Sequence, residues 1–399
     1  MEVKALKTFL QFGLRLLALP VVLVFYLLRK YMVVEFVLPN VTLFGHLALE
    51  PEKILSNIAT QGPRPVGEPK RVLIWSLGKS KDQVNKALVK IWRRELFVLP
   101  SAIIDAMHRA SKWLPNFEMR VLQFDKLHEN DHVLDSCESH LKFTSSEVKI
   151  GEKYLRDVGI EPANPYICLI VREAAWAPPT TGPSSSGTLR SRSFEDFLLA
   201  ADSLADLGVA VIKLGAAGTF KTAGTKIIDY ANSKDKSEFL DVYLPSHAKC
   251  VVSTMSGPDA VALVGRVPVL YVDIAQYSLC FAGTRLVTWV PARLISQKLG
   301  RAMSLSEVFE SGAGRFLGST AFEQAGIKIE QSSPEQIRDY CLDFYQSLTN
   351  QKLDDGPMQN LYREKFHTLL SKNSVAKLAP FSSSLSPSFL EKYGDNFLA

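Results

Sequence analysis

Along most of the chain, short runs of apolar residues alternate with segments in which apolar side chains recur every three or four positions. The first pattern predicts buried strands and the second predicts amphipathic helices. Strands that are apolar throughout are typical of a parallel sheet that helices cover on both faces. The runs assigned to such strands are residues 71–77 (RVLIWSL), 166–171 (YICLIV), 209–214 (VAVIKL), 250–253 (CVVS) and 267–272 (VPVLYV).

The first third of the chain contains one further strand and two helices by the same criteria. Residues 31–44 are rich in β-branched and aromatic residues, so they predict a strand that runs into a turn at Gly45. Residues 47–58 predict the helix that follows. Residues 81–96 predict a second helix, whose apolar face consists of Val84, Leu88, Ile91 and Trp92.

Capping signals and turn residues place the later elements. Ser193 and Asp196 resemble a capping box that opens a helix, and Gly208 ends that helix. Residues 333–336 (SPEQ) have the composition of another helix start. Residues 177–187 (APPTTGPSSSG) predict a loop.

The α/β pattern occurs twice, with a polar stretch at residues 130–165 between the two occurrences. We therefore expect an α/β protein with two tandem Rossmann-like domains. The expected parts are an N-terminal apolar helix, two domains and a tail that packs back, at residues 1–32, 33–160, 161–370 and 371–399.

Residues 9–28 form the most apolar window of the chain. The uninterrupted part, residues 16–28, is too short to cross about 30 Å of hydrocarbon, whereas the whole window just suffices with Arg15 near one end. Pro20 would suit a kinked helix at the membrane interface. Arg29 and Lys30 follow the window without a small-residue cleavage site, which is unlike a signal peptide. We expect membrane attachment through residues 9–28, either spanning or lying on the bilayer, with the body on the cytoplasmic side.

Composition narrows the class of protein further. The 399 residues are 47% hydrophobic and 22% charged, which excludes a disordered chain. A net charge of +5 that is spread along the chain carries no nucleic-acid signature. Five irregularly spaced cysteines indicate neither a disulfide framework nor a zinc site.

The sequence lacks the common catalytic signatures. It contains no dinucleotide-binding glycine motif, no P-loop, no Gly-x-Ser-x-Gly and no His-Glu-x-x-His. It also contains no Asp-x-Asp, the pair of carboxylates that would hold a metal ion against a diphosphate. We therefore expect chemistry that uses neither a metal ion nor another cofactor.

A small turn in the second half is the first candidate for binding. Ser256 and Gly257 lie between the strand that ends near residue 253 and a short helix that begins at Asp259. Main-chain N–H groups at such a helix start can bind a phosphate, and the Ser256 hydroxyl can add a hydrogen bond. A plain strand-to-helix turn, capped by Ser and Asp, is the alternative interpretation.

Cationic residues follow several of the predicted strands. Lys213 ends the strand at 209–214 before Gly215, Arg172 follows the strand at 166–171, and Arg190 precedes a helix. Ligands of an open α/β sheet bind beyond the carboxyl ends of its strands, so these cations are candidates to meet a diphosphate. Each of them would otherwise be an ordinary solvated charge.

His46 is the candidate general base. It follows Gly45 at the predicted end of the first strand, and Glu50 lies one helical turn further on. A capping or packing role is the alternative for His46.

The order of these motifs resembles that of a family of bacterial glycosyltransferases with a two-Rossmann (GT-B-like) architecture, linked to surface polysaccharide synthesis. The residues that carry the resemblance are 44–52 (FGHLALEPE), 85–94 (NKALVKIWRR), 190–197 (RSRSFEDF), 211–215 (VIKLG), 228–233 (IDYANS), 238–244 (EFLDVYL), 256–259 (SGPD) and 386–390 (SPSFL). Ser191 and Ser193 stand where that family has Asn and Asp, and Lys213 stands where it has Arg.

The resemblance implies a metal-independent enzyme that moves a sugar from a nucleotide-sugar donor to a glycan or lipid-linked acceptor. It implies a donor site in the second domain, formed by Arg172, Arg190, Lys213, Gly215 and the 256–259 turn, and His46 with Glu50 acting on the acceptor in the first. It also implies a place on the cytoplasmic side of the bacterial inner membrane. The alternatives are a membrane-attached nucleotide-sugar-binding scaffold without activity, and a two-Rossmann transferase of another group such as pyruvyl.

Overall fold

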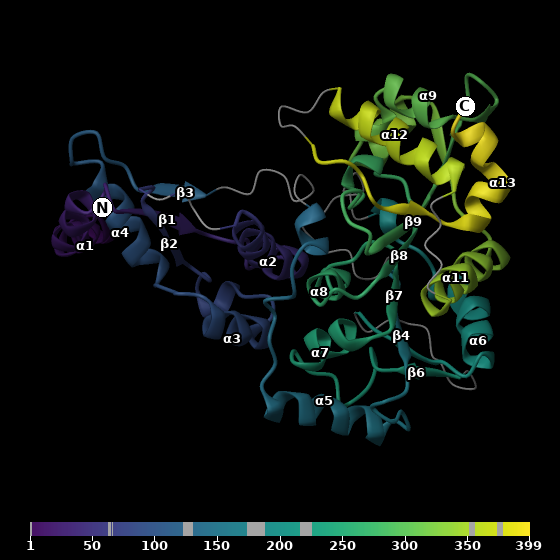
Figure 1. Cartoon of the computed structure of the whole chain (residues 1–399), viewed down its shortest axis with the longest axis horizontal. Helices are drawn as coiled ribbons and strands as arrows, with labels where there is room; N and C mark the ends of the chain where they lie inside the picture. Colours follow the sequence, from purple (N-terminus) through teal and green to yellow (C-terminus); the bar gives the residue numbers. More distant parts are fainter. Residues whose placement is uncertain are drawn as a thin grey trace. The chain divides into compact units, whose positions relative to one another are not determined.

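The computed structural model describes residues 2–62, 65, 67–122, 131–173, 188–215, 226–350, 356–372 and 378–399, and the side chains from residue 9 onward. The chain separates into two compact units, Met1–Leu127 and His128–Ala399 (Figure 1). This division comes earlier than the one expected after residue 160. The predicted loop at 177–187 lies outside the described residues.

The first unit contains a parallel sheet of three strands in its described residues. They are β1 (Met32–Val37), β2 (Lys70–Trp75) and β3 (Arg120–Leu122), in the order β2-β1-β3. On one face, Val34 and Phe36 of β1 enter a core together with Ile74 of β2. Its helices are α1 (Glu2–Leu27), α2 (Phe44–Thr60), α3 (Lys86–Glu95) and α4 (Ser101–Ser111).

The expected strand at 31–44 is too long, and the turn at Gly45 is wrong. Strand β1 ends at Val37, and Phe44 already begins α2. Pro39 has no N–H for a strand pair, and the Asn40 side chain accepts hydrogen bonds from the N–H and hydroxyl of Thr42. Such a local turn stops a strand early.

Helix α3 begins later than residue 81 because Asn85 caps it. The Asn85 side chain accepts a hydrogen bond from the Leu88 N–H at 2.8 Å. Leu88, Ile91 and Trp92 form the buried face as predicted, but Val84 lies outside the helix and is 44% exposed. The Trp92 indole donates to the Leu47 carbonyl and so joins α3 to α2.

The second unit is built on a parallel sheet of seven described strands. In chain order they are β4 (Tyr166–Ile170), β5 (Ala210–Lys213), β6 (Ile227–Asp229), β7 (Cys250–Ser253), β8 (Val269–Ile274), β9 (Val287–Pro291) and β13 (Ser384–Leu385). Their spatial order is β13-β9-β8-β7-β4-β5-β6. Numbered along the sheet this is 3-2-1-4-5-6-7, the order of a doubly wound fold, so the α/β class with parallel sheets is confirmed.

Helices cover both faces of this sheet. Figure 1 shows α7 (Leu240–His247) and α8 (Asp259–Val264) on one face, and α6 (Leu198–Asp206) and α11 (Pro334–Thr349) on the other. The remaining helices are α5 (Ser145–Asp157), α9 (Leu305–Glu310), α10 (Ser319–Gln324), α12 (Pro357–Ser371) and α13 (Pro387–Phe397). A small antiparallel sheet is formed by β10 (Arg293–Ser296), β11 (Arg301–Ala302) and β12 (Ile327–Glu330).

Two of the predicted helix starts have different outcomes. The predicted helix start at residues 333–336 is confirmed, because α11 begins at Pro334 and Ser333 and Gln336 form a capping box with both hydrogen bonds. The capping box at Ser193 and Asp196 is wrong. Ser193 instead caps a 3₁₀ turn, Phe194–Phe197, by accepting from the Glu195 N–H, and the Asp196 carboxylate accepts from Arg192.

Candidate functional site

The strand order of the second unit singles out the carboxyl ends of β4 and β7. These strands are neighbours in the sheet, but β5 continues on the far side of β4 and β8 on the far side of β7. In a doubly wound fold, ligands bind in the crevice at this switch in strand order. Arg172 follows β4 and Thr254 follows β7 at this place, and the Thr254 hydroxyl accepts a hydrogen bond from the Arg172 N–H at 2.9 Å.

Arg190 reaches the same place from a distant part of the sequence. It ends a 3₁₀ turn, Thr188–Arg190, and its Nη1 donates to the Met255 carbonyl at 3.0 Å. The Arg192 N–H donates to the Arg172 carbonyl at 2.9 Å, which holds the two segments together. The structure therefore brings Arg172, Arg190 and the turn at residues 254–258 into one cluster, called here the switch-point cluster.

Burial lowers the pKa of both arginines of this cluster. Burial and the charge of Arg190 lower the pKa of Arg172 to about 10. Burial lowers the pKa of Arg190 as well, against the opposing effect of the Asp259 charge. Two half-buried cations that disfavour each other are stabilised when an anion with several oxygens binds beside them.

Asp259 stabilises the turn from inside the protein. Its Oδ2 accepts from the Ser253 hydroxyl at 2.6 Å and from the Ser256 N–H at 2.5 Å, and its Oδ1 accepts from the Tyr271 hydroxyl at 3.1 Å. Burial raises the pKa of Asp259 to about 6, although these hydrogen bonds oppose the shift. The expectation that Asp259 faces the donor is therefore corrected, because both of its oxygens serve the fold.

Several main-chain donors that were expected to bind an anion at this turn already have partners within the protein. The N–H of Ser256 binds Asp259, and the N–H groups of Asp259 and Ala260 bind the carbonyls of Ser256 and Gly257. These donors are occupied, so the accessible parts of the turn are the half-buried Ser256 and Gly257 themselves. Met255, just before them, has φ 63°, a left-handed conformation that is costly for a residue with a side chain.

Lys213, at the end of β5, is buried and does not face solvent. Only 2% of its side chain is exposed, its Nζ lies 3.7 Å from Glu173 Oε2, and it also lies 4.4 Å from the centroid of the Phe194 ring. It therefore orients Glu173 and neutralises a carboxylate at the rim of the cluster. Gly215, two residues after the strand, has φ 107°, which explains why a glycine stands at this position.

Sequence reasoning missed a third arginine, Arg192. Arg192 is buried, and its guanidinium donates to Asp273, to Asp196 and to the Ser332 carbonyl. Asp273, at φ 56°, also accepts from the N–H and hydroxyl of Ser332. No local pattern marks this network, because its members come from three distant segments.

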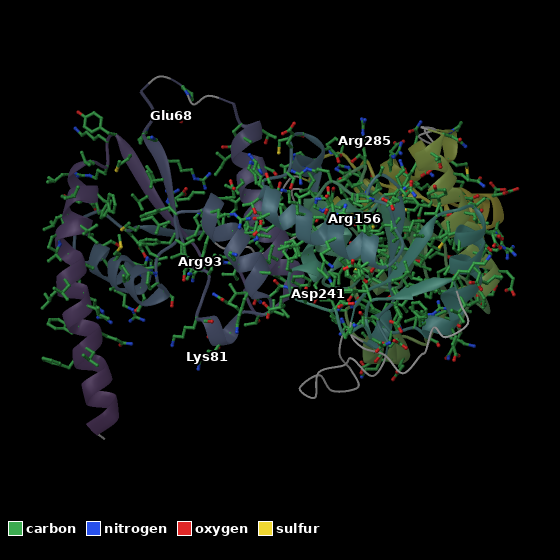
Figure 2. The ribbon with its side chains drawn as sticks, turned by 90° about the horizontal axis from the view of Figure 1, so that it is seen from below. Glu68, Lys81, Arg93, Arg156, Asp241 and Arg285 are labelled. Atoms are coloured by element: carbon green, nitrogen blue, oxygen red, sulfur yellow. The ribbon has the colours of Figure 1, made fainter. Side chains whose placement is uncertain are left out.

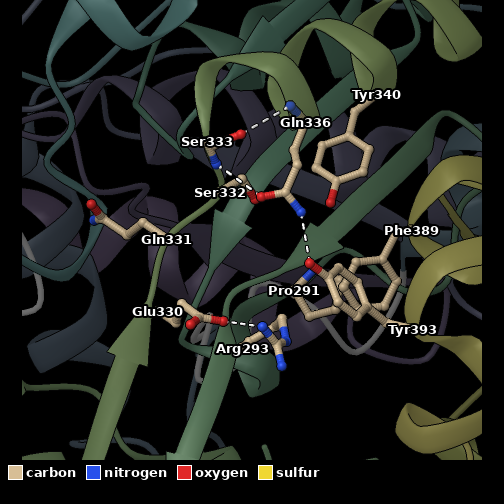
Figure 3. A pocket seen from close by; sticks show the side chains of 10 residues that line it. All are labelled: Pro291, Arg293, Glu330, Gln331, Ser332, Ser333, Gln336, Tyr340, Phe389 and Tyr393. Atoms are coloured by element: carbon tan, nitrogen blue, oxygen red, sulfur yellow. Dashed lines mark hydrogen bonds and ion pairs between the residues drawn. The ribbon is translucent and has the colours of Figure 1, made fainter.

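A cavity of about 300 Å³ adjoins this network (Figure 3). Ser332 belongs to both. Two lining pairs satisfy each other, since Gln336 Nε2 donates to the Tyr393 hydroxyl at 2.7 Å and Arg293 pairs with Glu330. The lining consists of Pro291, Arg293, Glu330, Gln331, Ser332, Ser333, Gln336, Tyr340, Phe389 and Tyr393.

The first unit holds the other candidate residues, His46 and Glu50. His46 lies in the first turn of α2 and not at a strand end, and its Nδ1 lies 2.7 Å from Glu50 Oε1. Glu50 is nearly buried, with 4% of its side chain exposed against 32% for His46, and its Oε2 accepts from the Asn40 N–H at 2.8 Å. With Glu50 as the acceptor of this hydrogen bond, His46 Nδ1 is the donor and Nε2 is left to accept. This geometry suits a general base that a carboxylate orients.

No metal site is evident in the part of the chain that the structure describes. Within those residues, no group of three or more His, Cys, Asp and Glu side chains could hold a metal ion.

No protein-family model and no curated protein matches this sequence. Among solved structures, it is similar to a glycosyl transferase of family 9 from Veillonella parvula, with 11% identity, TM-score 0.48, and 80% of this chain and 98% of that chain covered. It is also similar to the E. coli ADP-heptose lps heptosyltransferase II, with 13% identity, TM-score 0.36 and coverage of 81% and 100%. The iron-containing dodecameric glycosyltransferase TibC from E. coli shows 12% identity, TM-score 0.32 and coverage of 65% and 62%. At such scores no activity transfers to this chain, so the case for function rests on the sites themselves.

Proposed function

We propose that the protein is a metal-independent glycosyltransferase whose second unit binds a nucleotide-sugar donor. The observation that carries this proposal is the switch-point cluster, in which Arg172 and Arg190 lie together at the carboxyl ends of β4 and β7. The diphosphate of the donor fits this place by charge and by the number of its acceptor oxygens. The half-buried Ser256 and Gly257 are the accessible residues of the neighbouring turn.

The reaction that we propose is a displacement at the anomeric carbon. The acceptor hydroxyl oxygen attacks that carbon, the bond between the carbon and the diphosphate oxygen breaks, and the bonding electron pair leaves with the diphosphate. Nε2 of His46 takes the hydroxyl proton, and Glu50 stabilises the resulting imidazolium. Arg172 and Arg190 stabilise the charge of the departing nucleoside diphosphate, a role that a metal ion fills in other transferases.

Binding of the donor is tested by calorimetric titration with nucleoside diphosphates. We expect Arg190→Ala to weaken the affinity about 10- to 100-fold, because a charged hydrogen-bond donor is lost. Arg285→Ala is the matched control (Arg285 is labelled in Figure 2). Arg285 is exposed and lies before the amino end of β9, whereas the switch-point cluster lies at the carboxyl ends of the strands of the same sheet. Equal affinities of wild type and Arg190→Ala would remove the cluster from the donor site.

Turnover is tested separately, by following release of the nucleoside diphosphate from a panel of nucleotide sugars with chelator present throughout. We expect His46→Ala to lower kcat about 10²- to 10⁴-fold with little change in donor affinity, because only proton transfer is lost. Full turnover by His46→Ala would exclude His46 as the base. Binding without turnover of any donor by the wild type would favour the scaffold, and loss of activity in chelator would exclude metal independence.

The acceptor and the location belong to the same proposal. An acceptor on a lipid carrier, used for surface polysaccharide synthesis at the cytoplasmic side of a bacterial inner membrane, accounts for an enzyme with an apolar N-terminal helix. The support for this part is the helix together with the sequence resemblance.

A further inference from the structure

From residue 9 onward, the exposed side of helix α1 is apolar throughout. From residue 9 to residue 28 its polar side chains are Gln11 and Arg15, and both are half-buried in the stripe that continues through the buried Ala18 and Val22. Every exposed residue in this range is apolar. They are Phe9, Leu10, Phe12, Leu14, Leu16, Leu17, Pro20, Val21, Leu23, Val24, Leu27 and Leu28.

This arrangement is the reverse of that found on a helix that faces water. A surface helix of a soluble protein turns its apolar stripe inward and its polar residues outward. The outward-facing side chains of α1 are highly exposed, and the exposed fractions of Phe9, Leu17 and Leu27 are 74%, 76% and 72%. A continuous apolar surface of this size requires an apolar partner.

Length and composition alone would allow α1 to cross a membrane, since residues Phe9–Leu27 form a 19-residue stretch with a mean hydropathy of 2.0. Its packing argues otherwise. Ala18 and Val22 belong to the core that the β1 and β2 side chains Phe36 and Ile74 form with Met107 of α4. Removing α1 into a bilayer would therefore open the core of the first unit.

Helix α4 packs against α1 (Figure 1), and the long helix α1 extends beyond it (Figure 2). The Phe12 ring lies 6.1 Å from Trp113 just after α4, and the Tyr26 ring lies 5.5 Å from Phe117. A transmembrane α1 would carry the exposed ion pairs of this segment, Asp105–Arg109 and Lys112–Glu118, into hydrocarbon. Charges at that depth are costly, so the helix suits a position in the plane of the membrane.

The residues around α1 indicate which apolar partner covers it. Arg29 and Lys30 are exposed directly after the helix, and Lys4 and Lys7 precede the apolar window in the sequence. The exposed aromatic residues Trp113 and Tyr31, at 45% and 74%, lie beside it. Cations that flank an apolar surface, together with Trp and Tyr, match the head groups and interface of an anionic bilayer.

We infer that α1 lies in the plane of one leaflet of an anionic membrane, with its outer apolar face in the acyl boundary and its inner stripe on the protein. The first unit thus docks on the bilayer through one side of a helix that also completes its core. This inference does not depend on the proposed transferase activity.

The first measurement is flotation of the full-length protein with phosphatidylcholine vesicles, with and without about one third phosphatidylglycerol. We expect binding that the anionic lipid strengthens severalfold. Leu17→Glu should lower the partition coefficient about tenfold or more, because a large apolar side chain no longer enters the leaflet. Leu299→Glu is the matched control, an exposed leucine at 47% in the second unit, and it should bind as the wild type does.

The second measurement distinguishes lying from spanning. Inside-out membrane vesicles from cells that express the full chain with an N-terminal epitope tag are treated with protease. Loss of tag and body together supports the in-plane helix, whereas a protected tag beside a digested body would mean that α1 spans and would overturn the inference. The protein could instead fail to bind vesicles and form a dimer that dissociates in Leu17→Glu. That result would show that a second copy covers the apolar face, and it would also overturn the inference.

Discussion

Two arginine clusters lie at the same edge of the large sheet, and they differ in what neutralises them. Arg192 is buried with carboxylates of Asp273 and Asp196 at hydrogen-bond distance. The Arg190 guanidinium donates to the Met255 carbonyl, burial lowers its pKa, and burial together with the charge of Arg190 lowers the pKa of Arg172. The first cluster is an internal tie between segments. The second has the electrostatics of a site for an external anion.

The largest expected effect of this difference is on stability. Arg192→Ala leaves the Asp273 carboxylate buried beside the hydroxyl and N–H of Ser332 without its cation, so we expect a loss of about 3–5 kcal/mol in the free energy of unfolding. Arg190→Ala should cost less than about 1 kcal/mol, because a half-buried cation next to another cation is removed. Urea denaturation of both variants measures the contrast. Equal losses would mean that both arginines serve the fold.

A smaller effect concerns Asp259, the carboxylate whose charge reaches Arg190. Its pKa is about 6 in the folded protein and about 3.9 in an unfolded chain. Between these values the folded state holds more protons, so this group's contribution to stability is complete below about pH 4 and is lost as the pH rises through about 6. The loss is at most about 3 kcal/mol.

The measurement is the free energy of unfolding at several pH values for wild type and Asp259→Asn. The difference between the two proteins should change between about pH 4 and pH 7 and stay constant above that range. A difference that does not depend on pH would show that Asp259 is ionised throughout and is already neutralised by the cluster.

The smallest expected effect concerns Ser332, an uncharged residue of the buried network around Arg192. Ser332→Ala removes one hydroxyl donor from Asp273, while the Ser332 N–H and Arg192 remain. We expect a loss of about 1 kcal/mol in stability and no change in nucleoside diphosphate affinity, measured by denaturation and by titration. Weaker binding in this variant would mean that the cavity beside Ser332 is part of the donor site.

Much of the framework follows from local sequence. The apolar runs at 166–171 and 250–253 correspond to β4 and β7, because a strand buried on both faces must be apolar throughout. Strand ends locate Arg172 and Ser256, and a spacing of four residues places His46 and Glu50 one turn apart on a helix. These features depend on near neighbours in the chain.

The predictions from the sequence were wrong where contacts between distant residues determine the structure. The Asn40 side chain forms a local turn just after β1, and the Asn40 N–H donates to Glu50 of α2. The turn therefore comes at Asn40 and not, as predicted, at Gly45. Glu173 and the Phe194 ring enclose Lys213, and Ser253 and Tyr271 take the oxygens of Asp259, so two residues expected at the ligand face inward.

The sequence by itself determined the α/β class, the strands that meet at the switch in strand order, and the apolar helix at the N-terminus. The tertiary structure alone decided which charges are tied into the fold, such as Arg192 and Asp259, and which side of α1 faces out. The physical reason is that a charge or an apolar surface acquires its role from what packs against it, and packing joins residues that no local pattern relates.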